Sequence, residues 1–176
     1  ALGASPDDIL FAADQAYTIL DIKKSYMQEP RLFLFGSAES FLDKDEDFWH
    51  HMNSLPFYTY ANIGLESFDD AALRFFKKPV PSAVMQKAFK RMQRINKSYE
   101  NIEVTANILI GEDLPASHIP ALTAHIDEAV KKNAAKGCIY ISPLKGSRNT
   151  KKLLEQFRSI KQKSRIQTFL YLIQRL

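Results

Sequence analysis

Four short apolar segments of this chain end in polar residues and are separated by segments with helical periodicity. They span 32–40, 62–67, 102–112 and 138–146. Alternating strand and helix patterns favour parallel βα units, because a parallel connection needs a crossover that is usually a helix. The carboxyl ends of parallel strands meet at one edge of the sheet, so we expect the polar strand ends to gather there. The sequence therefore predicts a functional site at that edge.

Apolar runs and helical periodicity place the expected elements along the chain. The run 31–35 is apolar throughout except for Arg31, which predicts a strand buried on both faces. Further strands are expected over 57–65, 102–110 and 138–141. Helices are expected over 6–27, 45–54, 69–76, 117–130, 149–163 and 165–175, and a long helix begins at 81.

The chain is short for a closed barrel of parallel strands. It has 176 residues, whereas a closed eight-stranded (β/α) barrel usually needs ~250 residues. We therefore predict an α/β fold, a partial (β/α) TIM-like barrel with parallel strands and a helical C-terminus. Residues 1–146 would form the partial barrel, and residues 147–176 would form basic helices packed on it or extending from it.

Composition narrows the class of protein. No apolar run approaches the ~20 residues that span a bilayer, so no membrane association is expected. The single cysteine, Cys138, excludes an internal disulfide and fits a reducing, cytoplasmic compartment. The start of the chain has no signal-peptide pattern and no initiator Met, which is typical of a trimmed chain. No metal site is expected, because His118 and His125 are farther apart than the three or four residues of helical metal pairs.

Basic residues are concentrated near the C-terminus. Residues 131–176 contain 12 Lys or Arg and one acid, Glu155, whereas residues 1–130 contain 12 basic and 19 acidic residues. This asymmetry allows nucleic acid, a phosphate or another acidic partner to bind at 131–176. The alternative is a solvated helix face, or one that docks on the acidic front of the same protein.

Three charged residues stand where strands or helices are expected to end. Glu66 ends a buried strand, where a carboxylate must be either functional or paired with a neighbouring lysine. Glu39 follows Gly36 and could reach an ammonium or a ribose hydroxyl, or it could simply lie in a first helical turn. Lys78 could pair with a ligand carboxylate, or it could be a solvent-facing residue at a helix end.

Five segments of the chain resemble radical S-adenosylmethionine enzymes, in the branch of oxygen-independent coproporphyrinogen oxidase-like and methylthiotransferase-like proteins. Residues 33–42 (FLFGSAESFL) resemble the glycine and glutamate motif that follows an early strand in that family. Residues 62–73 (NIGLESFDDAAL) are similar to its IGLES strand and the helix after it. Residues 77–82, 107–111 (NILIG) and 140–144 (YISPL) resemble a lysine segment and two later strands.

The resemblance implies a role for six residues and departs from the family at the cluster. Contacts to S-adenosylmethionine are implied at Ser37, Glu39, Glu66, Ser67 and Lys78, and Gly111 would allow close backbone approach near the adenine. The family holds a [4Fe–4S] cluster on a CxxxCxxC loop after its first strand. This chain has one cysteine. Either the cluster comes from a missing N-terminal segment, or the chain is a member that has lost the cluster, and no catalytic residue is assigned here.

The chain is therefore expected to be a portion of a radical S-adenosylmethionine enzyme. It would position the cofactor and face an unknown substrate, and it would not be catalytic alone. The alternative is a non-catalytic α/β module that binds RNA or another acidic partner through its basic C-terminus.

Overall fold

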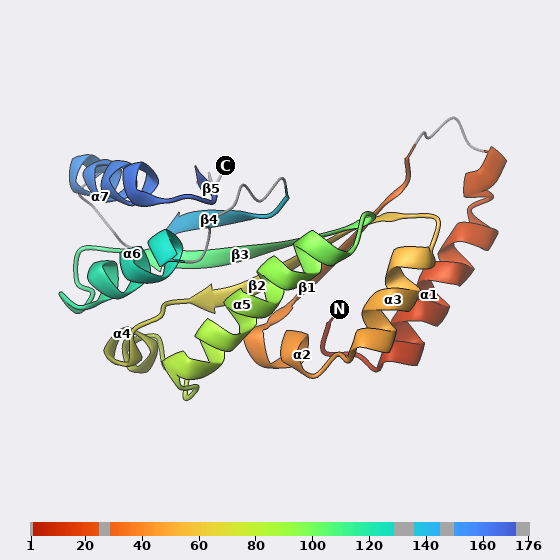
Figure 1. Ribbon diagram of the computed structural model, residues 1–176, viewed down its shortest axis with the longest axis horizontal. Coiled ribbons are helices and arrows are strands. Elements are labelled where there is room, and N and C mark those ends of the chain that lie inside the picture. Colours follow the sequence, from red (N-terminus) through yellow and green to blue (C-terminus); the bar gives the residue numbers. More distant parts are fainter. Residues whose placement is uncertain (1, 25–28, 129–135, 145–149, 172–176) are drawn as a thin grey trace.

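Five parallel strands form one sheet in the part of the chain that the structure describes. The structure is a computed structural model, and it describes residues 2–24, 29–128, 136–144 and 150–171 (Figure 1). The strands lie side by side in chain order, and each one is parallel to its neighbours. They are β1 (Arg31–Ser37), β2 (Tyr58–Glu66), β3 (Ile102–Ile110), β4 (Cys138–Pro143) and β5 (Gln167–Leu170). The α/β class and the parallel strands are confirmed.

Helices connect the strands, as parallel pairing requires. They are α1 (Pro6–Ile19), the 3₁₀ helix η1 (Ile22–Lys24), α2 (Ala38–Leu42), α3 (Glu46–Ser54), α4 (Asp70–Phe75), α5 (Ser82–Ser98), α6 (His118–Glu128) and α7 (Thr150–Lys163). Several begin at side-chain caps that the sequence indicates. Ser5, Asp45 and Asp69 each accept a hydrogen bond from a backbone N–H in the first turn of α1, α3 and α4.

One face of the sheet carries the hydrophobic core. Leu34, Ile63 and Val104 point to this face and are buried against Met85 and Met92 of α5. Helix α5 lies along the middle strands of the sheet (Figure 1). Alternate residues of a strand point to opposite faces, and in β2 they alternate strictly between buried and half-buried. The helices therefore cover one face, and the other face is the more open one.

The open face shows that one prediction for β1 is wrong. The apolar run 31–35 was expected to be buried on both sides, but the side chains of Phe33 and Phe35 are 58% and 61% exposed while Leu34 is buried. An apolar run alone cannot distinguish burial on two faces from burial on one. The exposed phenylalanines lie on the open face, next to Tyr60 and Asn62 in the register of β1 with β2.

Two expected helices differ from the structure. The helix expected over 165–175 is wrong, because β5 occupies Gln167–Leu170 and pairs with β4. Ile166 and Thr168 are buried and alternate with the exposed Gln167 and Phe169, which is strand periodicity. The first helix was expected to reach Met27 but ends at Ile19, since Asp21 adopts a left-handed backbone with φ 45°. Residues 25–28 and 172–176, at the ends of these two predictions, lie outside the described residues.

None of the helices in the described ranges combines the length and the apolar character needed to cross a bilayer.

Candidate functional site

A carboxylate and an ammonium meet at the carboxyl end of β2. The Lys78 ammonium lies 3.0 Å from Glu66 Oε1 and donates to the carbonyl oxygen of Gly64 at 3.2 Å. Both side chains are partly buried, 20% exposed for Glu66 and 29% for Lys78. Glu66 is thus paired with a neighbouring lysine, which was one of its two alternatives. That lysine is Lys78, which is itself a candidate to pair with a ligand carboxylate.

The backbone of β2 changes direction at Glu66. Glu66 has φ 62°, and the Ser67 N–H donates to the Leu65 carbonyl at 2.7 Å, which closes a three-residue turn around it. The pairing of β2 with β3 also shifts register between Gly64 and Glu66. Bulges of this kind re-aim a side chain and often lie next to functional sites. A left-handed non-glycine residue is costly and points to a constraint at this position.

Helix α4 places Lys78 against this strand end. The Lys78 N–H donates to the Leu73 carbonyl and the Lys77 N–H donates to the Arg74 carbonyl, which is the hydrogen-bond pattern of a Schellman motif. Lys77 takes the left-handed position of the motif with φ 57°. The helix ends there, and the next residue, Lys78, projects back over Gly64. A side chain on Gly64 would collide with Glu66, because an added Cβ would lie 2.6 Å from Glu66 Oε1.

Ser37 and Glu39 lie at the neighbouring strand end. Ser37 is paired with Gly64 in the sheet register, so it is next to the Glu66–Lys78 pair. Its hydroxyl accepts from the Ser40 N–H at 3.2 Å and caps α2. Glu39 lies in the first turn of α2 and is exposed, which matches the alternative that it is simply a first-turn residue of a helix.

Ser67 is turned away from this edge and into the interior. It is fully buried, and its hydroxyl lies 2.8 Å from Nδ1 of His118, which is also fully buried. The other ring nitrogen, Nε2, contacts the Leu109 carbonyl at 2.7 Å. A carbonyl can only accept, so Nε2 carries the proton and Nδ1 accepts from the Ser67 hydroxyl. Burial lowers the pKa of His118, so this serine–histidine pair is a neutral clamp between β2 and α6.

Gly111 follows β3 on the same edge. The side chain of Leu144 covers it, because an added Cβ would lie 2.8 Å from Leu144 Cδ1. The Leu144 N–H also donates to the Ile110 carbonyl at 2.8 Å. In this structure the missing side chain of Gly111 makes room for Leu144.

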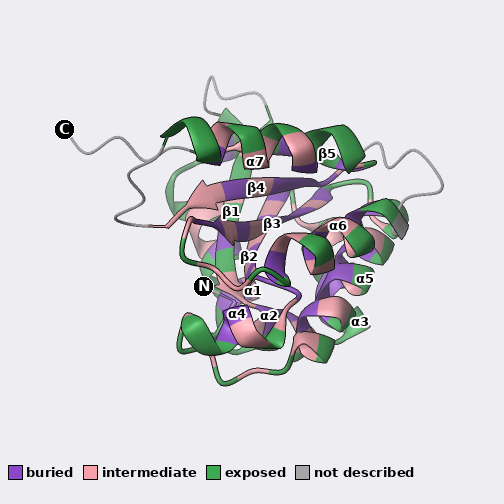
Figure 2. Cartoon of the chain, turned by 90° about the vertical axis from the view of Figure 1, so that its left-hand side faces the viewer, coloured by how far each residue is buried: buried purple, intermediate pink, exposed green. Residues whose placement is uncertain are grey.

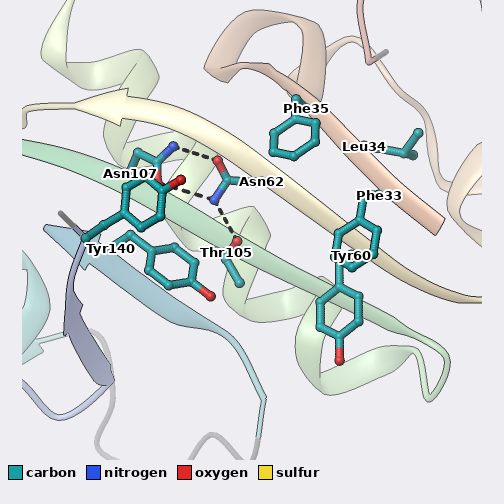
Figure 3. Close-up of a pocket in the computed structure, with 9 residues that line it drawn as sticks. Phe33, Leu34, Phe35, Tyr60, Asn62, Thr105, Asn107 and Tyr140 are labelled. Carbon is teal, nitrogen blue, oxygen red and sulfur yellow. Dashed lines mark hydrogen bonds between the residues drawn. The ribbon is translucent and has the colours of Figure 1, made fainter. Parts of the chain in front are cut away.

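Amide side chains form a polar network in the middle of the open face (Figure 3). Asn62 and Asn107 come from neighbouring strands and donate to each other's amide oxygens, at 2.6 Å and 3.4 Å. Asn62 also donates to the Thr105 hydroxyl at 2.8 Å. The network is next to the Glu66–Lys78 pair. Lys78 binds the carbonyl of Gly64, and Gly64 is paired with Asn107 in the sheet.

Aromatic rings surround the network. A cavity of about 330 Å³ opens over it, lined on the β1 side by Phe33 and Phe35 and on the other side by Tyr140 and Tyr171 (Figure 3). Phe33 stacks on Tyr60 with ring centroids 5.3 Å apart and planes 12° apart. A hydrogen bond with Cys138 and burial raise the pKa of Tyr140 to about 12. The Tyr140 phenol therefore stays neutral at physiological pH.

The described residues do not fit a metal or an iron–sulfur cluster. No group of three His, Cys, Asp or Glu side chains in the described ranges could hold a metal ion. A [4Fe–4S] cluster needs several thiolates, whereas the chain has one cysteine. That residue, Cys138, is buried at the start of β4, and burial raises the pKa of its thiol, which disfavours the thiolate.

Comparison of the chain with protein-family models, with curated proteins and with solved structures finds no match in any of the three.

The structure brings Ser37, Glu66 and Lys78 together and leaves Ser67 buried. The open-face residues Asn62, Thr105 and Asn107 were not among the predicted site residues. The sequence does contain a signal for them, a polar or aromatic residue at alternate positions of two neighbouring strands. In β2 these residues are Tyr58, Tyr60, Asn62 and Glu66, and in β3 they are Glu103, Thr105 and Asn107. Period-two polarity of this kind indicates a strand with one open face.

Proposed function

We propose that this chain is the cofactor-positioning part of a radical S-adenosylmethionine enzyme. The ion pair of Glu66 with Lys78 at the carboxyl end of β2 carries the proposal. The amino-acid end of S-adenosylmethionine bears an ammonium and a carboxylate. These two groups can replace the contact between Glu66 and Lys78: the ligand ammonium would bind Glu66, and the ligand carboxylate would bind Lys78. Each of the two partly buried charges would then keep an oppositely charged partner.

The order of the strands supports a partial barrel as the setting of this site. Parallel strands in unbroken chain order are the arrangement of a (β/α) barrel wall. Doubly wound sheets instead reverse their strand order at the ligand site. In a barrel wall the face without helices lines the interior of the barrel. In this proposal, the open face with Asn62 and Asn107 corresponds to that interior. This face would be the substrate-facing side.

The cluster of the family does not fit this chain, so no step of a radical reaction is assigned to it. We propose that the cluster ligands belong to a segment outside these residues. The role of the described residues is to bind and orient the amino-acid end of the cofactor. Without the cluster, which chelates that end in the family, we expect the chain alone to bind S-adenosylmethionine weakly.

Nuclear magnetic resonance of the ¹⁵N-labelled chain tests the proposal. Titration with S-adenosylmethionine to about 10 mM should shift the backbone signals of residues 36–39, 64–67 and 78, with half-saturation in the millimolar range. Glu66→Gln keeps the shape of the side chain and removes its charge, so it should abolish these shifts. The matched control is Glu39→Gln, an exposed carboxylate on the same edge, which should weaken them less.

Two outcomes contradict the proposed binding site, and a third contradicts the proposed role of the cluster. One is a spectrum that does not change up to the highest concentration. The other is a set of shifts centred away from the carboxyl end of β2, which would indicate that the cofactor binds elsewhere on the chain. Micromolar binding by the iron-free chain would also contradict the assigned division of labour, because the cluster would then add nothing to affinity.

A second candidate function is binding of RNA or another acidic partner through α7. The observation that favours it is the outward face of this helix, where Lys151, Arg158, Lys161 and Lys163 are exposed (Figure 2). RNA binding would weaken steeply with salt. The logarithm of the binding constant should fall linearly with the logarithm of the salt concentration, with a slope of about −0.7 for each phosphate neutralised on a single strand. Fluorescence anisotropy with a labelled single-stranded RNA at several salt concentrations separates this candidate from the first. An unchanged anisotropy at low salt rules it out.

A further inference from the structure

We infer that the open face of the sheet binds an uncharged, planar heteroaromatic compound that carries a hydrogen-bond donor beside an acceptor on one edge. The inference deepens the proposed function by naming a class of substrate, and it rests on that function in placing the substrate on this face. Four properties of the cavity over Asn62 and Asn107 lead to it: its size, its flat walls, its lack of charge and its unused hydrogen-bonding groups.

The size of the cavity suits a small ring system. Its volume is about 330 Å³, at the lower end of the ~300–1,000 Å³ that small-molecule pockets occupy. Such a site takes one or two fused rings. It is open on one side, so part of the ligand remains in solvent or touches other parts of the protein.

The walls are flat aromatic surfaces. Phe33 and Tyr60 are stacked in parallel, and Phe35 stands beside them with most of its side chain exposed. On the other side, the rings of Tyr140 and Tyr171 are in contact, with centroids 6.0 Å apart. The Phe35 ring is 61% exposed, and an exposed aromatic face favours a second ring that stacks on it. An aliphatic ligand would bury area here but would gain nothing from ring geometry.

The lining carries no formal charge. All nine described residues around the cavity are aromatic, aliphatic, hydroxyl or amide residues. Charged residues on the neighbouring strand positions have partners of their own: Glu103 accepts from the Tyr58 hydroxyl and the Gly137 N–H, and Glu66 is paired with Lys78. The guanidinium of Arg31 lies over the Tyr60 ring, 5.9 Å from its centroid. A charged ligand would lose hydration in the cavity without gaining a counter-charge, so an uncharged one is favoured.

The amide network leaves a donor and an acceptor unused within the described residues. Both N–H groups of Asn62 are taken, one by Asn107 and one by the Thr105 hydroxyl. Asn107 gives one of its two N–H groups to Asn62, and its other N–H remains. The amide oxygens of both residues keep a further lone pair. A ligand edge that offers both an acceptor and a donor satisfies this remaining pair, whereas an ether or a hydrocarbon edge does not.

A matched pair of probes tests the inference. Isoquinolin-1(2H)-one is planar and uncharged and has an N–H beside a C=O, and 2-methylisoquinolin-1-one is the same ring with the donor blocked. In ¹H–¹⁵N spectra of the chain, the first probe should shift the side-chain amide signals of Asn62 and Asn107. Its affinity should exceed that of the methylated probe by roughly fivefold to tenfold, the usual effect of one hydrogen bond.

Variants separate recognition from folding. Asn107→Leu should remove the difference between the two probes without abolishing binding, because the aromatic walls remain. Phe35→Leu should weaken both probes equally. The matched control is Gln167→Leu, an amide that is exposed on the same face of β5 and does not line the cavity, and it should keep the wild-type difference. Backbone spectra of each variant show whether it is folded.

The outcomes also distinguish this inference from the proposed function. Glu66→Gln should abolish the response to S-adenosylmethionine and leave the binding of both probes unchanged. Probe binding with no response to S-adenosylmethionine would overturn the proposed function and support the inference. Equal affinity of the two probes, or no shift at Asn62 and Asn107, would overturn the inference. Self-association of the chain that covers Phe33 and Phe35 would overturn it too, because a second copy would then be the occupant.

Discussion

Glu66 is held in a backbone conformation that does not suit its side chain. Its φ of 62° costs an L-residue roughly 1 kcal/mol, a cost that glycine avoids. The ion pair with Lys78 and the turn closed by Ser67 hold it there. The conformation presents the carboxylate over Gly64, whereas the side chain of an ordinary strand residue stands roughly perpendicular to the sheet.

Replacing Glu66 with glycine and with alanine separates the backbone cost from the loss of the ion pair. Both variants lose the contact with Lys78, but only alanine keeps the left-handed cost. We expect Glu66→Gly to be more stable than Glu66→Ala by about 1 kcal/mol. Urea unfolding followed by the fluorescence of the buried Trp49 measures the difference. Equal stabilities would mean that residue 66 relaxes to an ordinary conformation once its carboxylate is removed.

The buried His118 makes stability depend on pH. Burial lowers its pKa in the folded protein, against the smaller opposing effects of the Leu109 carbonyl and Asp69. In the unfolded chain its pKa returns to about 6.5. The unfolded state therefore binds a proton first as the pH falls, so this contribution is fully present above pH 6.5 and is lost as the pH falls toward the lower folded pKa.

His118→Gln should remove that part of the pH dependence. The free energy of unfolding of the wild-type chain should fall between pH 7.5 and pH 5.5, and that of His118→Gln should fall less. Urea unfolding at several pH values measures both slopes, and the exposed His50→Gln is the matched control. A steeper fall in His118→Gln would mean that the histidine is charged in the folded state.

At the scale of elements, the end of α4 shows how a local motif builds the site. Asp69 caps the start of this helix, and the Asp70 carboxylate accepts from the Ser82 N–H at 2.7 Å and so joins α4 to the start of α5. The Schellman motif then ends the helix, with Lys77 in the position that glycine usually takes. Lys78 reaches Glu66 because of this ending.

Lys77→Gly should therefore stabilise the protein. Glycine takes the left-handed position without strain, so we expect a gain of about 0.5–1 kcal/mol in the free energy of unfolding. The matched control is Lys87→Gly, at an exposed position inside α5, which should cost about 1 kcal/mol. If both variants are destabilised alike, the end of α4 is not in the left-handed conformation in solution.

The elements that the sequence predicts well are those with local signals. Ser5, Asp45 and Asp69 predict where helices begin, and the strand expected over 102–110 matches β3. β5 was missed because it has only four residues and follows a long helix. Its strand character comes from pairing with Cys138–Ile141 of β4, which a local pattern does not contain.

The candidate site was predictable only at the level of single strand ends. Glu66 and Lys78 stood out as charges at the ends of elements, but their contact depends on the turn of α4 and on the bulge in β2. Ser67 follows Glu66 directly and points inward to His118, which continues the alternation of faces along β2, whereas the left-handed residue Glu66 and the end of α4 are irregular. Backbone irregularities of this kind have no clear sequence signal.

At the scale of the whole molecule, the two faces of the sheet differ in what covers them. Parallel sheets are normally covered on both faces. Here the helices cover one face, and Phe33, Phe35 and Phe169 remain half exposed on the other. The occupant that we infer for the open side is a planar heteroaromatic ligand. Mutational energetics can show whether this side is open in the isolated chain.

Neighbouring residues of β1 provide the test, because Leu34 and Phe35 point to opposite faces. Leu34→Ser removes a buried side chain and should cost about 2–4 kcal/mol. Phe35→Ser removes a larger side chain that is 61% exposed, so it should change stability by less than about 1 kcal/mol. Urea unfolding at two protein concentrations measures both. A large cost at Phe35 that grows with protein concentration would mean that a second copy covers the face, and a large cost independent of concentration would mean that the chain itself covers it.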